Sequence, residues 1–340
     1  MTASVRVAGT DIAFDCGPDE TVLDAAERAG YLLPYSCRKG VCTTCAAGLV
    51  DGTARQSGRG LVEAPSEDLL LCRATACSSL EIAPASVTRG EPPSRRTMTA
   101  TVHKITRPAP DVAVLVLRYP IGKRVRFRAG QYLTVRLPDG DTRNYSMANP
   151  PHRNDGVLLH VRGVPGGRFS EQVVSGLRRG DELTVELPFG GFTVDAVSSR
   201  PIVLLVTGTG FAPAKSIIED LIQRRDGRPV HLYWGARTSS DLYLADLPSR
   251  WASRYPWFRF TPVLSEPDAR WSGRTGPVHR AVVDDHPELS DREVFACGNP
   301  AMTDAARSDL LAAGLPPERF HCDAFVPSGL GDQLEPAAHQ

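Results

Sequence analysis

The stretch Pro34-Tyr-Ser-Cys37-Arg-Lys-Gly-Val-Cys42-Thr-Thr-Cys45 decides how the first part of this chain folds. It places three cysteines within nine residues, and Cys72 follows after 26 intervening residues. Gly40 allows a tight bend, and the small side chains of the loop let its backbone approach inorganic sulfide closely. This spacing is typical of four thiolates that hold a [2Fe–2S] cluster. We therefore predict that Cys37, Cys42, Cys45 and Cys72 bind such a cluster.

The same cysteines could serve two other kinds of site. Structural zinc sites usually combine two short Cys pairs, and the spacing here differs from that pattern. Disulfide bonds need an oxidising compartment, and the sequence shows no signal peptide that would lead to one. The other four of the eight cysteines are scattered, as expected in a reducing compartment. We therefore favour the cluster and expect a cytoplasmic protein.

Charge is distributed unevenly along the 340 residues, although the formal net charge is zero. Residues 1–91 carry 12 acidic and 8 basic side chains, whereas residues 92–195 carry 9 acidic and 16 basic ones. The basic middle predicts an anionic cofactor, and the acidic first part predicts a docking face for a protein, with chance asymmetry of solvated surfaces as the alternative. No apolar run approaches the roughly 20 residues that span a bilayer, so we expect no membrane segment. We expect no nucleic-acid partner either.

Residues 1–90 are predicted to form a small β-grasp domain around the cysteine loop. Alternating apolar residues over 5–7 and 12–14 predict a hairpin, and a helix is expected from about residue 19 to Gly30. Short strands are expected at residues 47–50, 69–71 and 80–82. A domain of this size buries little surface, so metal binding should contribute to its folding.

Two further domains are predicted after a proline-rich, charged linker at residues 88–98. Short alternating runs in residues 97–196 predict an antiparallel β-barrel. Apolar strands that alternate with helical stretches in residues 200–328 predict a parallel α/β sheet. The expected fold is an α+β multidomain protein. The strands expected in these two domains are residues 101–105, 112–118, 132–137, 157–161, 182–187, 202–206, 230–234, 257–264 and 294–297.

Two motifs of the predicted barrel point to a flavin nucleotide. Arg143-Asn-Tyr145-Ser146 follows a predicted strand, and Pro165-Gly166-Gly167-Arg-Phe-Ser170 precedes a predicted helix that Ser170 could cap. An arginine and a glycine-lined helix N-terminus together suit a pyrophosphate. Tyr145 could stack on a flavin ring, and Ser146 could reach the N5 edge of that ring. Taken separately, these residues are better explained as a core tyrosine and an ordinary loop; their combination after the cysteine loop favours the flavin.

Two motifs of the predicted parallel sheet point to a nicotinamide nucleotide. Gly208-Thr209-Gly210-Phe-Ala-Pro213 is a strand-to-helix phosphate turn that lacks the third glycine of G-x-G-x-x-G. Cys297-Gly298-Asn-Pro300 follows a later strand, and ligands of open α/β sheets bind at the carboxyl ends of strands. Cys297 is therefore expected to face the nicotinamide, with a small buried hydrophobe as the alternative.

Taken together, these motifs resemble those of the NAD(P)H-dependent flavin and [2Fe–2S] reductase components of multicomponent bacterial oxygenases. That family belongs to the ferredoxin–NADP reductase superfamily, and the resemblance covers essentially residues 3–326. It implies a [2Fe–2S] ferredoxin domain at residues 1–90, an FAD-binding domain at residues 97–196 and an NAD(P)H-binding domain at residues 200–328. Two features depart from the family. Thr43 stands where many similar proteins have glycine, and fifteen residues follow Phe325, whereas superfamily members often end at an aromatic that covers the flavin.

The resemblance also implies the roles of individual residues. Ser146, Cys297 and Phe325 would lie on the hydride path between nicotinamide and flavin. The implied cluster ligands are Cys37, Cys42, Cys45 and Cys72. The implied FAD-binding residues are Arg143, Tyr145, Ser146, Gly166, Gly167 and Ser170, and the implied nicotinamide nucleotide-binding residues are Gly208, Thr209, Gly210, Pro213, Gly298 and Pro300.

The implied activity is transfer of electrons from NADH through FAD to the [2Fe–2S] cluster and on to a protein partner. FAD is favoured over FMN because the Gly166-Gly167-x-x-Ser170 element suits a diphosphate. NADH is favoured over NADPH because the similar segment of oxygenase reductases generally goes with NADH. In this chain, residues 235–241 include Arg237, which could accept a 2′-phosphate, but also the acidic Asp241 and no basic cluster. The expected partner is an oxygenase or hydroxylase component. The alternatives are an enzyme that deoxygenates sugar nucleotides, of the CDP-6-deoxyhexose reductase type, and a non-enzymatic iron–sulfur sensor.

Overall fold

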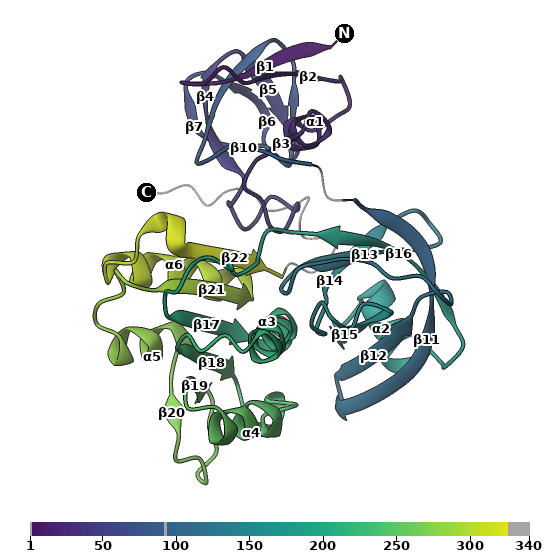
Figure 1. Cartoon of the computed structure of the whole chain (residues 1–340), viewed down its shortest axis with the longest axis vertical. Coiled ribbons are helices and arrows are strands. Elements are labelled where there is room, and N and C mark those ends of the chain that lie inside the picture. The colour runs from purple at the N-terminus through teal and green to yellow at the C-terminus, as the bar shows by residue number, and fades with distance from the viewer. Residues whose placement is uncertain (1, 92–93, 326–340) are drawn as a thin grey trace. The chain divides into compact units, whose positions relative to one another are not determined.

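In a computed structural model, the described residues, 2–91 and 94–325, fall into two compact units (Figure 1). One unit ends at Ser94, and the other spans Arg95–Phe325. Each unit has its own hydrophobic core. Within the described residues, no helix is long and apolar enough to cross a membrane.

The first unit has the β-grasp arrangement expected from the sequence. Its main sheet has the strand order β2-β1-β9-β4-β7, in which β1 pairs antiparallel with β2 and parallel with β9. Helix α1 packs against it through Val22, Leu23 and Ala26, which are fully buried. The strands of this sheet are β1 (Ala3–Val7), β2 (Ala13–Cys16), β4 (Ala46–Asp51), β7 (Ser66–Leu70) and β9 (Leu80–Pro84), and the helix is α1 (Val22–Arg28).

Two details of the first unit differ from the sequence-based expectations. Helix α1 begins at Val22 rather than near residue 19, because the Thr21 hydroxyl caps it by accepting the Asp24 N–H (3.2 Å). The expected linker is shorter, because β10 (Thr88–Arg89) pairs with β3 (Tyr31–Leu32) and the next strand already begins at Arg96. The remaining strands, β5 (Thr53–Gln56), β6 (Gly60–Glu63) and β8 (Ala74–Ala76), form a small separate sheet.

The second unit begins with a six-stranded antiparallel sheet in the order β14-β13-β16-β11-β12-β15. A bridge links Met147, the residue after the edge strand β14, to Leu159 of the other edge strand, β15, so the sheet closes into the expected barrel. Helix α2 (Arg168–Ser175) follows the last of these edge strands. The strands are β11 (Arg96–Ala109), β12 (Val112–Arg118), β13 (Tyr132–Arg136), β14 (Thr142–Ser146), β15 (Gly156–Arg162) and β16 (Glu182–Phe189).

A six-stranded parallel sheet follows, in the order β20-β19-β18-β17-β21-β22. The chain starts at the central strand β17, moves outward through β18 to β20, and returns to β21 on the other side (Figure 1). This reversal makes the carboxyl ends of β17 and β21 the switch point at which such sheets bind ligands. The elements are β17 (Ile202–Thr207), α3 (Phe211–Arg224), β18 (Val230–Ala236), α4 (Asp246–Arg254), β19 (Phe258–Leu264), β20 (Arg274–Thr275), α5 (Val278–Asp285), β21 (Glu293–Gly298), α6 (Pro300–Ala312) and β22 (Phe320–Ala324).

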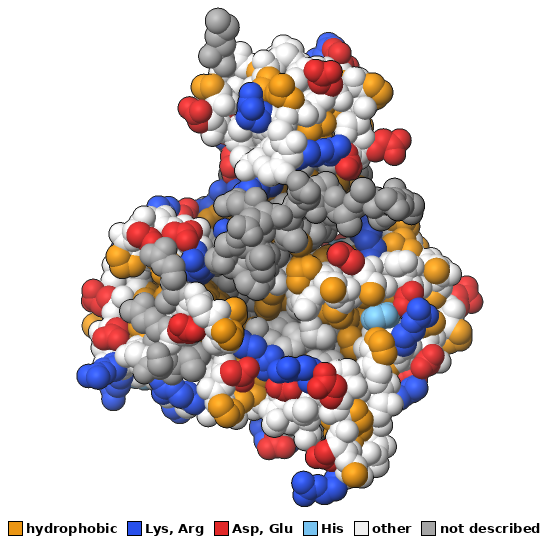
Figure 2. Space-filling view, turned by 180° about the vertical axis from the view of Figure 1, so that it is seen from behind, with side chains coloured by type: hydrophobic (Ala, Val, Ile, Leu, Met, Phe, Trp, Pro, Cys, Tyr) orange, Lys and Arg blue, Asp and Glu red, His pale blue; other side chains and the backbone are white. Residues whose placement is uncertain are grey.

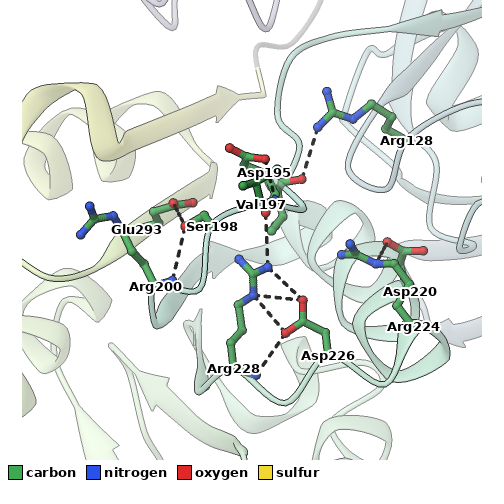
Figure 3. Close-up of polar contacts among 11 residues, drawn as sticks. Arg128, Asp195, Val197, Ser198, Arg200, Asp220, Arg224, Asp226, Arg228 and Glu293 are labelled. Carbon is green, nitrogen blue, oxygen red and sulfur yellow. Dashed lines mark hydrogen bonds and ion pairs between the residues drawn. The ribbon is translucent and has the colours of Figure 1, made fainter.

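The barrel and the parallel sheet share part of one core. Val112, Ala129 and Phe192 of the barrel region pack in the same cluster as the buried residues of β17 and β18. The segment that joins the two sheets is held from both sides, as Figure 3 shows. Arg128 donates to Val194 O (3.3 Å), Arg228 donates to Asp195 O (3.3 Å), and the Ser198 hydroxyl donates to Glu293 (2.6 Å). The boundaries of the three domains expected from the sequence stay predictions.

Candidate cofactor sites

The four cysteines of the predicted cluster site come together as two pairs. The Sγ atoms of Cys45 and Cys72 lie 3.2 Å apart. The backbone N–H of Cys37 donates to Cys42 Sγ, and that of Cys42 donates to Cys37 Sγ, each at 3.5 Å. All four side chains are buried, and none of the four forms a disulfide bond. Within the described residues, no group of three or more metal-binding side chains surrounds a single ion position. In a two-iron cluster, each iron takes two protein ligands, whereas one structural zinc ion takes four. Two pairs of thiols therefore fit the cluster better than they fit zinc.

The hydrogen bonds within each pair favour the thiolate form of one of its two cysteines. A hydrogen bond from the Cys42 thiol lowers the pKa of Cys37 below its ordinary value, and the Lys39 N–H adds a donor at 3.3 Å. The Cys72 thiol lowers the pKa of Cys45 in the same way. The pKa values of Cys42 and Cys72, the other member of each pair, are raised. One thiol of each pair is thus prepared to become a thiolate.

Three residues between Cys37 and Cys45 have left-handed backbone conformations. The φ angles are 53° at Arg38, 77° at Gly40 and 52° at Thr43. A Cβ atom on Gly40 would lie 3.0 Å from Arg73 Cγ, so this glycine also allows a close approach. Thr43 departs from the glycine of similar proteins at a position where glycine has a physical advantage, because a β-branched residue is strained at positive φ.

The residues predicted to bind the flavin lie in a strand that the sequence did not reveal. Arg143, Tyr145 and Ser146 belong to β14, not to a loop after a strand. The guanidinium of Arg143 pairs with Asp141 (2.6 Å), and the Tyr145 ring lies 5.6 Å from the Phe169 ring. Burial raises the pKa of Tyr145 above its ordinary value, so the phenol stays neutral. An arginine and an aromatic ring two residues apart on one strand share a face of the sheet, which suits a phosphate and a ring of one ligand.

The glycine turn before α2 has the expected close packing, but Ser170 does not cap the helix. Helix α2 begins at Arg168, so Ser170 lies inside its first turn, and its hydroxyl accepts the Val164 N–H at 3.1 Å. A Cβ atom on Gly167 would lie 2.4 Å from Ser170 Oγ, which excludes a side chain there. The Gly166 N–H donates to the Glu171 carboxylate (2.7 Å), so this carboxylate holds a donor that a phosphate would use.

Glycines let the two nucleotide motifs pack closely at the switch point of the parallel sheet. A Cβ atom on Gly210 would lie 2.3 Å from Cys297 O, and one on Gly298 would lie 2.1 Å from Thr207 Oγ1. The Asn299 N–H donates to the same Thr207 hydroxyl at 3.3 Å. The remaining predicted residues lie close by in sequence, with Thr209 in the turn, Pro213 in the first turn of α3 and Pro300 as the first residue of α6. The motif residues thus form one continuous edge.

Cys297 is fully buried, and its desolvation raises the pKa of the thiol well above the ordinary value. It is paired in register with Asp323 of β22. Burial of this kind also fits the alternative of a small hydrophobic residue, so its nicotinamide-facing role stays a prediction. Phe325 follows the end of β22 and donates its N–H to Gly298 O at 2.7 Å. The tail after Phe325 lies outside the described residues.

Sequence reasoning missed two charged residues that the fold brings to these motifs. Asp323 is almost completely buried, and its carboxylate lies 3.4 Å from the Ser146 hydroxyl. Arg162, the last residue of β15, extends to the phosphate turn, where a Cβ atom on Gly208 would lie 3.2 Å from its Nη1 atom. Its Nε atom is 3.0 Å from Asp111, and its Nη2 atom is 3.9 Å from Asp241. The only sequence signal was an arginine directly after the strand expected at residues 157–161.

Sequence models of three domain families match this chain. They are a 2Fe-2S iron-sulfur cluster binding domain at residues 5–77, an oxidoreductase FAD-binding domain at residues 99–194, and an oxidoreductase NAD-binding domain at residues 204–308. All three expected cofactors, the [2Fe–2S] cluster, FAD and NADH, thus have a binding domain in this oxidoreductase.

Whole proteins of known role are also similar to it. Reductase component 1 of terephthalate 1,2-dioxygenase from Comamonas sp. is 43% identical over 335 residues, which cover 97% of this chain and 99% of that protein. The CDP-6-deoxy-L-threo-D-glycero-4-hexulose-3-dehydrase reductase of Yersinia pseudotuberculosis is 36% identical and covers 96% of this chain and 100% of its own length.

Among solved structures, the crystal structure of a cytochrome P450 reductase from Amycolatopsis matches with a TM-score of 0.78 and 32% identity, over 96% of this chain and 99% of that one. The α+β fold expected from the sequence is confirmed by this likeness and by the three domain matches. With relatives of this identity over nearly its whole length, the chain belongs to the family of NAD(P)H-dependent flavin and [2Fe–2S] reductase components of multicomponent bacterial oxygenases, within the ferredoxin–NADP reductase superfamily.

Proposed function

We propose that this reductase delivers electrons from NADH to an oxygenase component, and that the residues predicted above hold its cofactors. When bound, NADH supplies two electrons as a hydride, FAD divides them, and the [2Fe–2S] cluster passes them on singly. The role of the protein is to position these groups and to control what surrounds them. The relatives that are reductase components of a dioxygenase support the oxygenase partner.

The contact between Ser146 and Asp323 is the observation that carries this proposal. It brings the end of the flavin-binding strand β14 to the carboxyl edge of the parallel sheet, where Cys297 lies beside Asp323. Hydride transfer needs the two reacting rings in contact, and a shared edge of this kind provides that proximity. Arg162 extends from the barrel to the phosphate turn of the sheet, so both layers would hold the same coenzyme.

Arg162 is proposed to bind the pyrophosphate of the nicotinamide coenzyme. Its guanidinium lies beside a glycine turn with φ of 54° at Gly208, which leaves the backbone open to a ligand. The side chains of two aspartates hold the guanidinium. Asp111 belongs to the barrel, and Asp241 follows β18 of the parallel sheet. An anion that binds there would form charge-assisted hydrogen bonds with a group that is already oriented.

The four paired thiols are proposed to ligate the cluster. We also propose a cytoplasmic location, because cysteines that ligate a cluster must be reduced and a reducing compartment keeps them so. The dehydrase reductase from Yersinia pseudotuberculosis supports a second candidate partner, an enzyme that removes oxygen from a nucleotide-linked sugar.

One experiment separates the two partners. The purified holoprotein is supplied with NADH and either an oxygenase component with an aromatic carboxylate or a CDP-hexulose dehydrase with its substrate. We expect product and stoichiometric NADH oxidation only in the oxygenase reaction. Product in the dehydrase reaction alone would replace the first proposal by the second. Reduction of ferricyanide in both mixtures serves as the control that the reductase is intact.

A further inference from the structure

Helix α1 is bonded to both segments of the chain that carry the predicted cluster ligands. The guanidinium of Arg38, the residue after Cys37, pairs with two carboxylates of this helix. Its Nη2 atom is 2.6 Å from Glu27 Oε2, and its Nη1 atom contacts Asp24 Oδ1. At the start of the helix, the Leu23 N–H donates to the carbonyl oxygen of Leu71 (3.1 Å), the residue before Cys72. One helix therefore fixes both ends of the ligand set.

The ion pair between Arg38 and Glu27 is shielded from water, whereas the Asp24 side chain of the second ion pair is 39% exposed. The side chain of Glu27 is 5% exposed and that of Arg38 is 17% exposed. The Tyr35 ring lies 4.5 Å from Arg38 Cζ and covers the guanidinium, and the Thr21 hydroxyl donates to the Asp24 carboxylate at 2.6 Å. Loss of either partner of a buried pair leaves a charge without compensation, which destabilises the fold far more than loss of an exposed pair does.

Arg38 also has a backbone conformation that it would not adopt without support. Its φ of 53° lies in the left-handed region, where residues with a Cβ atom are strained. Such conformations persist where surrounding contacts enforce them. The contacts here are the two carboxylates and the ring, so they hold the turn that separates Cys37 from Cys42.

We propose that Asp24, Glu27 and Arg38 form a clamp that sets the geometry of the cysteine loop and tunes the reduction potential of the cluster. The inference deepens the proposed function. It rests on one part of it, namely that Cys37, Cys42, Cys45 and Cys72 hold the cluster. These three are positioning residues, because they act through the loop and through their charge. Reduction adds negative charge to the cluster, so the cation of Arg38 favours the reduced form and the anion of Glu27 disfavours it.

The test uses the full holoprotein and the substitutions Arg38→Gln and Glu27→Gln, separately and together. The matched control is Glu20→Gln. It removes the ion pair (2.8 Å) between Glu20, which lies two residues before the helix, and Arg28 of the helix, whose side chain is 55% exposed. The midpoint potential of the cluster, its visible circular dichroism and the rate of iron release to a chelator are measured. FAD content and NADH-driven ferricyanide reduction report on the second unit.

We expect Arg38→Gln to lower the potential, Glu27→Gln to raise it, and the double variant to return towards the original value. Iron release should quicken by about tenfold or more in both single variants and stay unchanged in Glu20→Gln. Shifts of the same sign in both single variants, or unchanged iron release, would overturn the clamp. If Arg38→Gln takes up no cluster, Arg38→Lys decides, because it should keep the potential and still release iron faster.

Failure of the proposed function has a different appearance. If Cys42→Ser kept a full cluster, the ligand assignment would be wrong whatever the clamp variants show. If the clamp variants behave like the control while Cys42→Ser loses the cluster, the ligands stand and the clamp is refuted.

Discussion

The hydroxyl oxygen of Ser146 lies 3.4 Å from a carboxylate oxygen of Asp323, although the two residues are 177 positions apart in the sequence. Ser146 ends a strand of the barrel, and Asp323 lies in the last strand of the parallel sheet. Both side chains are buried, so the contact is a bond between the two layers and not a surface encounter. It places a negative charge at the edge where the two nucleotide ligands are proposed to meet.

Replacing Asp323 by asparagine should slow flavin reduction by NADH about tenfold or more, because a fixed negative charge would stabilise the positive charge that develops on nicotinamide as it gives up hydride. The asparagine can still accept the Ser146 hydrogen bond, so FAD content should not change. Stopped-flow absorbance of the anaerobic holoprotein gives the rate. Flavin reduction at an unchanged rate would show that the Asp323 charge takes no part in this step.

Replacing Arg162 by glutamine should raise the KM for NADH by about one to two decades, because a charge-assisted hydrogen bond contributes about 1.5–3 kcal/mol. The rate at saturating NADH should change little. Arg118→Gln is the matched control, because Arg118 also ends a barrel strand and pairs with an aspartate, Asp155, at an exposed site. Equal KM values for NADH in the Arg162→Gln and Arg118→Gln variants would show that Arg162 does not bind the coenzyme.

Replacing Cys42 by serine should remove or destabilise the cluster and leave bound FAD and NADH-driven ferricyanide reduction intact. The reason is that both cysteine pairs lie in the first unit, whereas the flavin and nucleotide motifs lie in the second. Iron content and the visible spectrum are measured, with Cys77→Ser as the control because Cys77 is exposed. Loss of flavin reduction in Cys42→Ser would contradict this separation of carriers.

Replacing Thr43 by glycine should stabilise the cysteine loop. A residue with a Cβ atom in the left-handed region carries about 1–2 kcal/mol of strain, and the greater freedom of glycine in the unfolded chain offsets roughly 0.5–1 kcal/mol of the gain. We expect a net increase of about 1 kcal/mol or less in the free energy of unfolding of the first unit. Denaturant titration followed at the cluster absorbance gives this value, and a lower midpoint than in the unmodified chain would contradict it.

Electron delivery to the protein partner should slow as salt is added, because residues 1–91 carry more acidic than basic side chains. The decrease of the electron-delivery rate with salt concentration should be modest, since Figure 2 shows acidic and basic side chains interspersed over the visible face of the first unit. Partner turnover is compared with direct flavin reduction by NADH over the same salt range. Equal salt dependence of the two rates would refute electrostatic docking.

Most of the fold followed from the sequence because its strands and helices carry ordinary apolar periodicity. Strand β14 was missed because Thr142-Arg-Asn-Tyr-Ser146 shows no alternation of apolar and polar residues. A strand that carries a polar ligand site on its face is expected to lack this alternation. The residues of β10, Thr88–Arg89, were assigned to a linker because two polar residues give no strand signal without their partner β3.

The candidate site was predictable where a motif carries its own chemistry and not where tertiary packing supplies it. The cysteine spacing and the glycine turns are local patterns. Arg162 and Asp323 are single charged residues at the end of one strand and inside another, and only the pairing of distant strands brings them to the motifs. The cap expected from Ser170 was wrong because the helix begins at Arg168.

The backbone contact at Gly210 and Gly298 limits how this enzyme can be redesigned. A side chain at either position would overlap Cys297 O or Thr207 Oγ1, so random substitution there would yield misfolded chains and not altered coenzyme preference. Positions 237–241 after β18 are half-exposed or exposed, so substitutions there do not meet this close contact. A mutant library aimed at NADPH use should therefore place its diversity around Arg237 and Asp241 and keep both glycines invariant.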